Sequence, residues 1–434
     1  MGRANTLTNV VSTFMVLWCP VWVTMNWMSL EYFDGSLPAL IKAFWTTDDA
    51  LSMIWRYLPQ ASWTASLAYA SWLAFQALLY YALPGKTSFG QRTPGGCRHR
   101  YEINGAMAWA ITHLLFAVAV VQEWLDPAWI AKNWAGLFVA ANVYGYLLAV
   151  FVFVKGRYAP TNVEDRKFSG SWAYDFWMGL ELNPRIGSHF DVKLFHNGRP
   201  GIVAWTLIDL SFAAWQYEKF GSVSNSMLIV IVLHTVYTLD FFFNEDWYLK
   251  TMDITHDHMG MMLAWGDAVF LPSFYTIQAQ YLAYHPVQLS TPAFIALMAL
   301  GMGAYAAFRA SNSEKLHVRE ADGDTMVWGR PATALRCNYW TADGKEHQSL
   351  LLTCDWWSIA RHTNYTADLV LAWAMCAPCS GDGLVLPPWT YFIFQFVLLN
   401  HRIIRGEESC RNKYGEKWEE YCEIVPWRLI PGIY

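Results

Sequence analysis

Residues 134–155 read WAGLFVAANVYGYLLAVFVFVK and contain no charged side chain before the final lysine. A hydrocarbon core about 30 Å thick needs a helix of roughly 20 mostly apolar residues to cross it. This stretch therefore predicts a membrane-spanning helix. Similar runs occupy residues 10–30, 62–83, 106–124, 201–218, 225–243, 260–283, 290–309, 366–380 and 384–400. The chain is expected to be an all-α integral membrane protein with eight to ten spans.

The composition supports the same class of protein. Of the 434 residues, 55% are hydrophobic and 15% are charged, whereas soluble domains carry roughly 25% charged residues. Aromatic residues make up 17% of the chain, and their amphipathic rings suit the boundary between lipid and water. The net charge of −5 gives no positive field that would attract nucleic acid. We therefore expect membrane lipid, and not nucleic acid, as a partner.

The polar segment 311–350 interrupts the apolar runs. It is rich in turn-forming residues, and the alternating patterns at 326–328 and 337–340 predict a short hairpin. We therefore expect a transmembrane helix bundle over residues 1–310 and a membrane-associated C-terminal part over residues 311–434.

No cluster of metal ligands is apparent in the sequence. Cys376 and Cys379 form the one C-x-x-C, and it lies in an apolar run without a second pair of suitable ligands. His256 and His258 are alternate residues, which do not share a helix face. We expect packing for the cysteines, a hydrogen-bonded cluster for the histidines, and no metal.

Polar side chains occupy one face of the run 225–243. Tyr237, Asp240 and Asn244 follow one another at spacings of three and four residues, which places them on one helix face. Ionisable groups at membrane depth are costly and usually face a cavity. We interpret Asp240 as lining such a cavity, whereas Glu245 and Asp246 are equally consistent with a helix end that emerges into water.

A second group of polar residues lies between 352 and 368. If this segment is helical, Trp357, Arg361, Asn364 and Asp368 form one stripe. Such a stripe suits a planar, charged ligand, which it would bind by stacking and hydrogen bonding. It is equally typical of a contact between helices that contains an internal Arg361–Asp368 pair.

The C-terminal segment combines basic and aromatic residues. His401-Arg402-x-x-Arg405 is followed by Cys410-x-x-Lys413-Tyr414 and then by Trp418-x-x-Tyr421. This composition fits a phosphate-bearing ligand and equally fits anionic lipid headgroups. Because the chain has neither G-x-G-x-x-G on a strand–helix turn nor a Walker A motif, any dinucleotide would bind outside a Rossmann fold.

Several motifs together resemble one family. They are Gln91-Arg92-Thr93-Pro94-Gly95-Gly96, Glu181-Leu182-Asn183-Pro184-Arg185, the stretch from Asp240 to Gly266, Arg361-His362-x-Asn364-Tyr365, and Lys413-Tyr414-Gly415. On these residues the chain resembles the delta-14/delta-7 sterol reductase family. Residues 244–251 and 430–434 are more similar to the 7-dehydrocholesterol reductase branch than to the delta-14 branch.

The resemblance implies a fold of about ten transmembrane helices that is multi-pass in the endoplasmic reticulum membrane. It implies that NADPH binds to the C-terminal part on the cytosolic side. A sterol would be the substrate, and a sterol isomerase is a candidate partner protein. The implied cofactor contacts are Lys315, Arg319, Leu352, Trp357, Asn364, Tyr365, Gly406, Cys410, Arg411, Asn412, Lys413, Tyr414 and Tyr421.

The implied activity is NADPH-dependent reduction of the sterol delta-7 (C7–C8) double bond. The nicotinamide would supply a hydride, and we expect Tyr237 to supply the proton, with Asp240 and Asn244 tuning it through hydrogen bonds. The alternatives are a delta-14 sterol reductase and a catalytically weak sterol-binding membrane protein.

The chain departs from the family pattern at two places. Gly406 stands where the family usually has Asp after His-Arg-x-x-Arg, and Glu407 follows it. Cys354-Asp355 replaces a usual Ser-Gly pair before the two tryptophans. Either Glu407 takes over the role of the missing carboxylate, or activity is altered.

Overall fold

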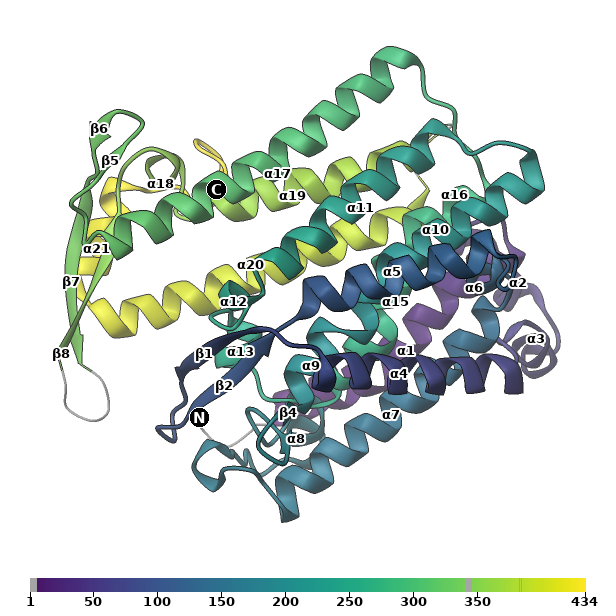
Figure 1. The fold of residues 1–434 in the computed structure, drawn as a ribbon, viewed down its shortest axis with the longest axis horizontal. Helices are drawn as coiled ribbons and strands as arrows, with labels where there is room; N and C mark the ends of the chain where they lie inside the picture. Colours follow the sequence, from purple (N-terminus) through teal and green to yellow (C-terminus); the bar gives the residue numbers. More distant parts are fainter. Residues whose placement is uncertain (1–5, 341–345, 382, 384) are drawn as a thin grey trace. The chain divides into compact units, whose positions relative to one another are not determined.

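The chain forms two compact units, which are described separately. The computed structural model describes residues 6–340, 346–381, 383 and 385–434. The first unit contains Met1–Gln288 and Cys379–Pro388, and the second contains Leu289–Pro378 and Trp389–Tyr434 (Figure 1). The boundary at Leu289 differs from the expected one near 310, because helix α17 (Thr291–Glu320) continues through that position.

The first unit is almost entirely helical. Its helices are α1 (Thr6–Tyr32), α2 (Leu37–Thr46), α3 (Ala50–Tyr57), α4 (Trp63–Ala82), α5 (Gly105–Val121), α6 (Trp129–Lys132), α7 (Trp134–Tyr158), η1 (Val163–Asp165), α8 (Trp172–Met178), α9 (Val192–Gly198), α10 (Pro200–Phe220), α11 (Asn225–Phe243), α12 (Glu245–Tyr248), α13 (Met252–Thr255), α14 (Met261–Trp265), η2 (Gly266–Phe270), α15 (Leu271–Phe274) and α16 (Ile277–Tyr284). Two antiparallel pairs of strands join them: β1 (Lys86–Arg92) with β2 (Arg98–Ile103), and β3 (Arg185–Ile186) with β4 (Phe190–Asp191).

Four helices of the described residues are long and apolar enough to cross a membrane, namely α1, α7, α11 and α17, and α5 is a shorter apolar helix. Local signals fix several helix ends. The side chain of Ser224 accepts a hydrogen bond from the backbone N–H of Met227 and begins α11. Gly221, with φ +75°, ends α10 in the left-handed conformation that glycine adopts without steric cost. The helical membrane class is confirmed, and the number of ten spans stays a prediction.

The span expected over residues 260–283 is not one helix. It divides into α14, the π-helical turn η2, α15 and α16. Pro272 lies in the first turn of α15, where its missing N–H is tolerated. The apolar composition of this segment reflects burial in protein, since Trp265, Val269 and Phe274 are all buried in one core with residues of α7. The prediction of a continuous span here is wrong.

The second unit joins helices to two small hairpins. Its elements are α17, β5 (Met326–Val327), β6 (Arg330–Pro331), β7 (Ala334–Trp340), β8 (Glu346–Leu352), α18 (Trp356–Ile359), α19 (Thr363–Cys376), η3 (Ala377–Cys379), α20 (Leu386–Tyr414) and α21 (Glu416–Ile424), of which η3 and α20 extend into the first unit. Strands β7 and β8 pair antiparallel from Ala334↔Leu352 to Trp340↔Glu346, which confirms the predicted hairpin. Helix α19 packs along α17 (Figure 1).

The stripe expected over residues 357–368 is divided between two helices. Helix α18 ends at Ile359, Ala360 is extended with φ −157° and ψ 155°, and α19 begins at Thr363. Trp357 and Asn364 therefore do not share one helix face, and the prediction of a continuous stripe is wrong.

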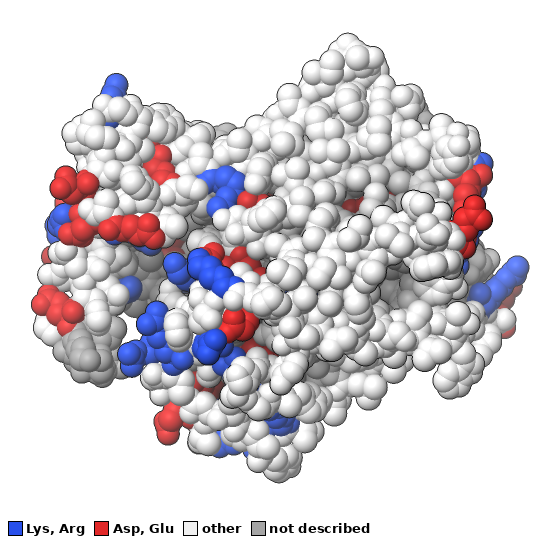
Figure 2. Space-filling view, viewed as in Figure 1, with Lys and Arg blue, Asp and Glu red and all other residues white. Residues whose placement is uncertain are grey.

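Charged and apolar side chains are segregated on the surface. Figure 2 shows charged side chains gathered where β7, β8 and α21 lie, and a nearly uncharged surface over α5 and α11. On these two helices large apolar side chains are exposed, among them Leu114, Leu115, Leu228, Val232 and Phe243. Exposed apolar surface of this extent suits contact with lipid.

Candidate functional site

The polar face predicted in the first unit forms as expected. Tyr237, Asp240 and Asn244, which we call the α11 group, are all half-buried. The Asn244 side-chain N–H donates to Oδ1 of Asp240 over 3.2 Å and to the Asp240 backbone carbonyl over 2.9 Å. Asn244 therefore orients the carboxylate of Asp240, as the spacing of four residues predicts.

Aromatic rings surround Tyr237. Its ring lies 5.7 Å from that of Trp205, which also contacts Tyr275 at 5.0 Å. Trp109 and Phe241 belong to the same cluster. The negative faces of aromatic rings attract positive charge, so this surrounding can stabilise a cation-like centre beside the tyrosine.

A buried pair that was not predicted from the sequence lies one turn before Tyr237. Nδ1 of His234 lies 2.9 Å from Oδ2 of Asp209, and both side chains are fully buried. The ring of His234 also packs against Trp205, at 5.1 Å. The available signal was an aspartate and a histidine inside two apolar runs, and the pairing between helices α10 and α11 was not visible.

Glu245 is not solvated. Its carboxylate accepts hydrogen bonds from Arg199 Nη2 at 2.6 Å and from the backbone N–H of Gly105 at 2.9 Å, and Arg199 also donates to Oδ1 of Asn104. Arg199 and Glu245 are both fully buried. The interpretation of Glu245 as an exposed helix end is wrong, whereas Asp246 does lie at the surface, where it pairs with Lys86.

The two histidines that follow do not converge. His256 is exposed and His258 is buried. Between them the backbone carbonyl of Asp257 accepts a hydrogen bond from Lys193 Nζ, which also donates to Ile254. The segment therefore holds a buried lysine through backbone carbonyls.

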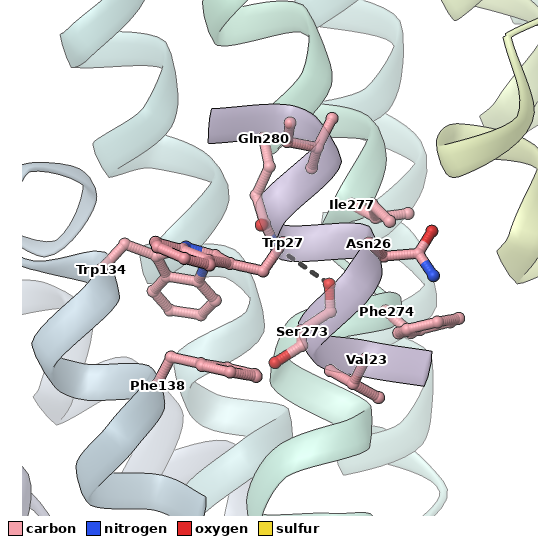
Figure 3. Close-up of a pocket in the computed structure, with 10 residues that line it drawn as sticks. Val23, Asn26, Trp27, Trp134, Phe138, Ser273, Phe274, Ile277 and Gln280 are labelled. Atoms are coloured by element: carbon pink, nitrogen blue, oxygen red, sulfur yellow. Dashed lines mark hydrogen bonds between the residues drawn. The ribbon is translucent and has the colours of Figure 1, made fainter. Parts of the chain in front are cut away.

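A small hollow lies elsewhere in the first unit (Figure 3). Trp27, Trp134 and Phe138 line it on one side, and Gln280 donates a hydrogen bond to the Ser273 carbonyl across it over 2.9 Å. Its volume is about 10 Å³, room for about one water molecule, whereas pockets for drug-sized ligands measure about 300–1,000 Å³. The hollow is too small to enclose a sterol.

In the second unit, the predicted cofactor contacts on α17 lie beside an aromatic ring. Lys315 Nζ is 4.2 Å from the centre of the Trp357 ring, a distance at which the cation and the π face attract each other. Arg319 donates to the backbone carbonyl of Leu350 over 3.2 and 3.3 Å. Trp357 is itself fixed, since its indole N–H donates to the Ser311 carbonyl over 3.0 Å.

Other predicted contacts occupy structural positions. Leu352 is buried in a core with Val318 and Trp357, and Tyr421 is buried against Trp418. The Asn364 amide donates to Oδ1 of Asn312 on α17. The predicted contacts not yet described are Tyr365, which stacks on His362, Arg411, which pairs with Glu419 at the surface, and Asn412, which is exposed.

Three cations influence the thiol of Cys410. Burial raises the pKa of the Cys410 thiol, and the charges of Lys315, Lys413 and Arg319 each oppose that rise. Lys413 Nζ also lies 3.5 Å from the centre of the Tyr339 ring, and the ring of Tyr414 meets the edge of the same ring. We call Lys315, Arg319 and Lys413 the cation cluster.

Glu407 is held by two arginines. Its Oε1 accepts hydrogen bonds from Arg361 Nε at 3.0 Å and Nη2 at 2.8 Å, and its Oε2 accepts one from Arg428 at 2.9 Å. Arg361 therefore pairs with Glu407, and the expectation of an Arg361–Asp368 pair is wrong. A Cβ added at Gly406 would meet open space, so an aspartate would fit there.

Long apolar helices, with a polar face in the first unit and a cation cluster in the second, define a helical membrane protein. The chain belongs to the ergosterol biosynthesis ERG4/ERG24 family, which matches residues 7–434.

The relatives carry names of sterol reductases. The chain is 46% identical over 433 residues to 7-dehydrocholesterol reductase of Xenopus laevis, covering 97% of this chain and 91% of the relative. It is 44% identical to the Danio rerio protein of the same name, covering 97% and 90%. It is 37% identical to Delta(14)-sterol reductase of Methylotuvimicrobium alcaliphilum, covering 96% and 92%.

Proposed function

We propose that this chain is a sterol reductase that uses NADPH to reduce the delta-7 (C7–C8) double bond of a sterol. The observation that carries the proposal is the similarity of 44–46% identity, over nearly the whole chain, to two proteins named 7-dehydrocholesterol reductase. The identity to Delta(14)-sterol reductases is lower, at 34–37%. This difference favours the delta-7 bond over the delta-14 bond.

The cation cluster supports NADPH as the cofactor. Within the part of the chain that the structure describes, no ion pair joins Lys315, Arg319 or Lys413 to a carboxylate. Three cationic side chains that form no ion pair among the described residues favour a multiply charged anion. The 2′-phosphate and the pyrophosphate of NADPH carry such charge, and the hydride of its nicotinamide is what the reduction requires.

The α11 group supports a proton transfer to the substrate. The Tyr237 hydroxyl would donate a proton to one carbon of the double bond, and Asp240, oriented by Asn244, would tune that hydroxyl. The ring of Trp205 would stabilise the positive charge that develops on the sterol. Residues of this chain thereby supply proton transfer and electrostatic stabilisation.

Turnover with two sterols tests the proposal. Purified protein in detergent would receive NADPH with either 7-dehydrocholesterol or a delta-8,14 diene sterol, and mass spectrometry would identify the products. We expect loss of the delta-7 bond. Loss of the delta-14 bond alone would reassign the substrate, and sterol binding without any product would contradict the proposed reaction.

A second candidate function is that of a catalytically weak sterol-binding protein, and Gly406 is the observation that favours it. The ion pairs of Glu407 with Arg361 and Arg428, which we call the Glu407 clasp, oppose this candidate. They show that a carboxylate next to Gly406 is already held in place. Gly406→Asp distinguishes the two. A gain of at least tenfold in turnover would support the catalytically weak protein. Turnover within twofold of the native value would indicate that Glu407 already fills the role of the family's usual aspartate.

We further propose that the protein is multi-pass in the endoplasmic reticulum membrane, with its C-terminal part facing the cytosol. The four long apolar helices support residence in a membrane. A sterol isomerase as partner rests on the family resemblance alone. Labelling of Cys410 in sealed microsomes by an impermeant maleimide would test the orientation, because a cytosolic thiol reacts without detergent.

A further inference from the structure

A mixed group of sulfur and oxygen ligands lies beside the cation cluster in the second unit. The side chains of Glu314, Cys354 and Asp355 each place one ligand atom so that all three atoms lie within 4.8 Å of one another. Glu314 is on α17, and the other two follow β8 at the start of α18. Because the glutamate and the cysteine are forty positions apart in the sequence, no spacing motif predicts the group.

Glu314 is buried, and one of its carboxylate oxygens could accept a further ligand. Its residue is 8% exposed, and Oε1 has no hydrogen-bond partner among the residues that the structure describes. Leaving a buried carboxylate oxygen without a hydrogen-bond partner destabilises the fold. A bound cation would satisfy this oxygen.

The backbone at Asp355 points the same way. Its φ of +46° lies in the left-handed region, which favours glycine and strains other residues. Its side chain makes no capping hydrogen bond to the helix that it precedes. Asp355 adopts this conformation although it does not cap the helix. Binding of a cation by its carboxylate would explain an aspartate at this position.

We propose that Glu314, Cys354 and Asp355 bind one divalent cation of the zinc class. Thiolate together with carboxylate suits a borderline metal such as Zn²⁺ and disfavours Mg²⁺ or Ca²⁺, which prefer oxygen ligands alone. Tetrahedral zinc, with bonds of about 2.3 Å to sulfur and 2.0–2.2 Å to oxygen, brings its ligand atoms to about 3.3–3.6 Å from one another. Rotation of the side chains would bring the ligand atoms, which lie within 4.8 Å of one another, up to about 1.5 Å closer together.

The metal would link two segments that carry predicted cofactor contacts. Glu314 directly precedes Lys315, and Asp355 lies two residues before Trp357, so the cation would fix the relative position of the lysine and the ring that it covers. Three protein ligands leave a fourth position for water. On binding, the Cys354 thiol loses its proton to solvent and no electron is transferred. The role is one of positioning.

The sequence alone predicts no metal, because its one C-x-x-C pair and the two histidines His256 and His258 offer no site. Neither takes part here, because the ligands come from a helix and from a turn that are brought together only by the fold.

Binding of Co²⁺ to the full-length protein in detergent tests the proposal directly. Cobalt replaces zinc in such sites, and a cobalt–thiolate bond absorbs in the near ultraviolet. We expect this absorption to saturate at one Co²⁺ per chain and to disappear when Zn²⁺ is added. Cys354→Ser should abolish it, and Glu314→Gln should weaken Co²⁺ binding at least tenfold.

Matched controls separate the site from other thiols and acids. Cys422→Ser removes another half-buried cysteine of the same unit, and Glu320→Gln removes an exposed acid of the same helix, so both should leave the absorption unchanged. Absence of the band in the native protein, or its persistence in Cys354→Ser, would overturn the proposal. The readout uses neither NADPH nor a sterol, so failure of the proposed reduction would leave it intact.

Discussion

The proposed role of Tyr237 as proton donor depends on its hydroxyl and not on its ring. The ring packs on Trp205, and so does that of Tyr275. Phenylalanine at either position keeps this packing and removes one hydroxyl. The two tyrosines therefore form a natural pair in which chemistry can be separated from structure.

Tyr237→Phe should lower kcat by about 100-fold or more, since a positioned general acid contributes about 10²–10⁴-fold. Binding of NADPH, followed by tryptophan fluorescence, should stay within twofold of the native value. Tyr275→Phe serves as the control and should keep most of the turnover. Full turnover in Tyr237→Phe would remove this tyrosine from the mechanism.

Lys315→Gln should raise the Kd for NADPH by about tenfold or more, because a hydrogen bond to a charged group contributes about 1.5–3 kcal/mol. If Lys315 contacts the 2′-phosphate, the Kd for NADH should change little. Lys417→Gln, which removes an exposed lysine paired with Glu420 in the same unit, should leave both constants unchanged. Equal weakening of NADPH and NADH would place Lys315 elsewhere on the dinucleotide.

At the scale of helices and strands, apolar length predicted well and local continuity predicted poorly. The run 134–155 became α7 because every side of that helix is apolar. The run 260–283 failed because composition cannot distinguish a helix in lipid from broken helices buried in protein, and Trp265 and Phe274 are buried in this way. Helix α17 extends beyond its expected end because its last turns are polar. A hydropathy pattern detects only the apolar part of such a helix.

The candidate site was predicted to a similar degree. The spacing of Asp240 and Asn244 predicted their hydrogen bond, because both lie on one helix. Partners that are far apart in sequence were not predictable. Glu407 meets Arg361 and Arg428 across separations of 46 and 21 residues, and only the fold brings them together.

Glu407 ties α20 to the start of α19 and to the C-terminal segment, and its loss should loosen all of them. Glu407→Gln should lower the free energy of unfolding by about 3–5 kcal/mol, because it leaves Arg361 buried without its counter-charge. Glu408→Gln changes the exposed neighbour and should have little effect. Thermal unfolding of both variants in detergent measures the difference.

The same clasp predicts a dependence on pH. Burial raises the pKa of the Glu407 carboxyl, but the nearby His362 and hydrogen bonds from Arg428 and Arg361 outweigh it and lower the pKa from 4.5 to about 2. A lowered pKa in the folded state stabilises the protein fully above pH 4.5, and this contribution is lost as the pH falls toward 2. The difference in Tm between the native protein and Glu407→Gln should shrink over that interval. A constant difference would contradict the clasp.

At the scale of the whole molecule, the division into two units makes a prediction about where ligands act. The cation cluster lies in the second unit and the α11 group in the first. NADPH should slow hydrogen exchange mainly in segments 311–320, 346–365 and 406–421, because bound ligand stabilises the parts that it contacts. NADH at the same saturation is the control for the 2′-phosphate. Protection confined to the first unit would refute the location of the cofactor.

Helix α17 has a mechanical consequence. Its 30 residues form one unbroken rod about 45 Å long, apolar at the beginning and carrying Lys315 and Arg319 near the end. A rod embedded in lipid tilts when the bilayer becomes thinner than its apolar length, and a stiff helix transmits that tilt to its far end. We expect the Kd for NADPH to differ between nanodiscs of short-chain and long-chain lipids. In detergent, where there is no bilayer thickness to respond to, the Kd should not depend on acyl-chain length. The thickness of the surrounding lipid would then act as a control on an enzyme whose cofactor binds outside it.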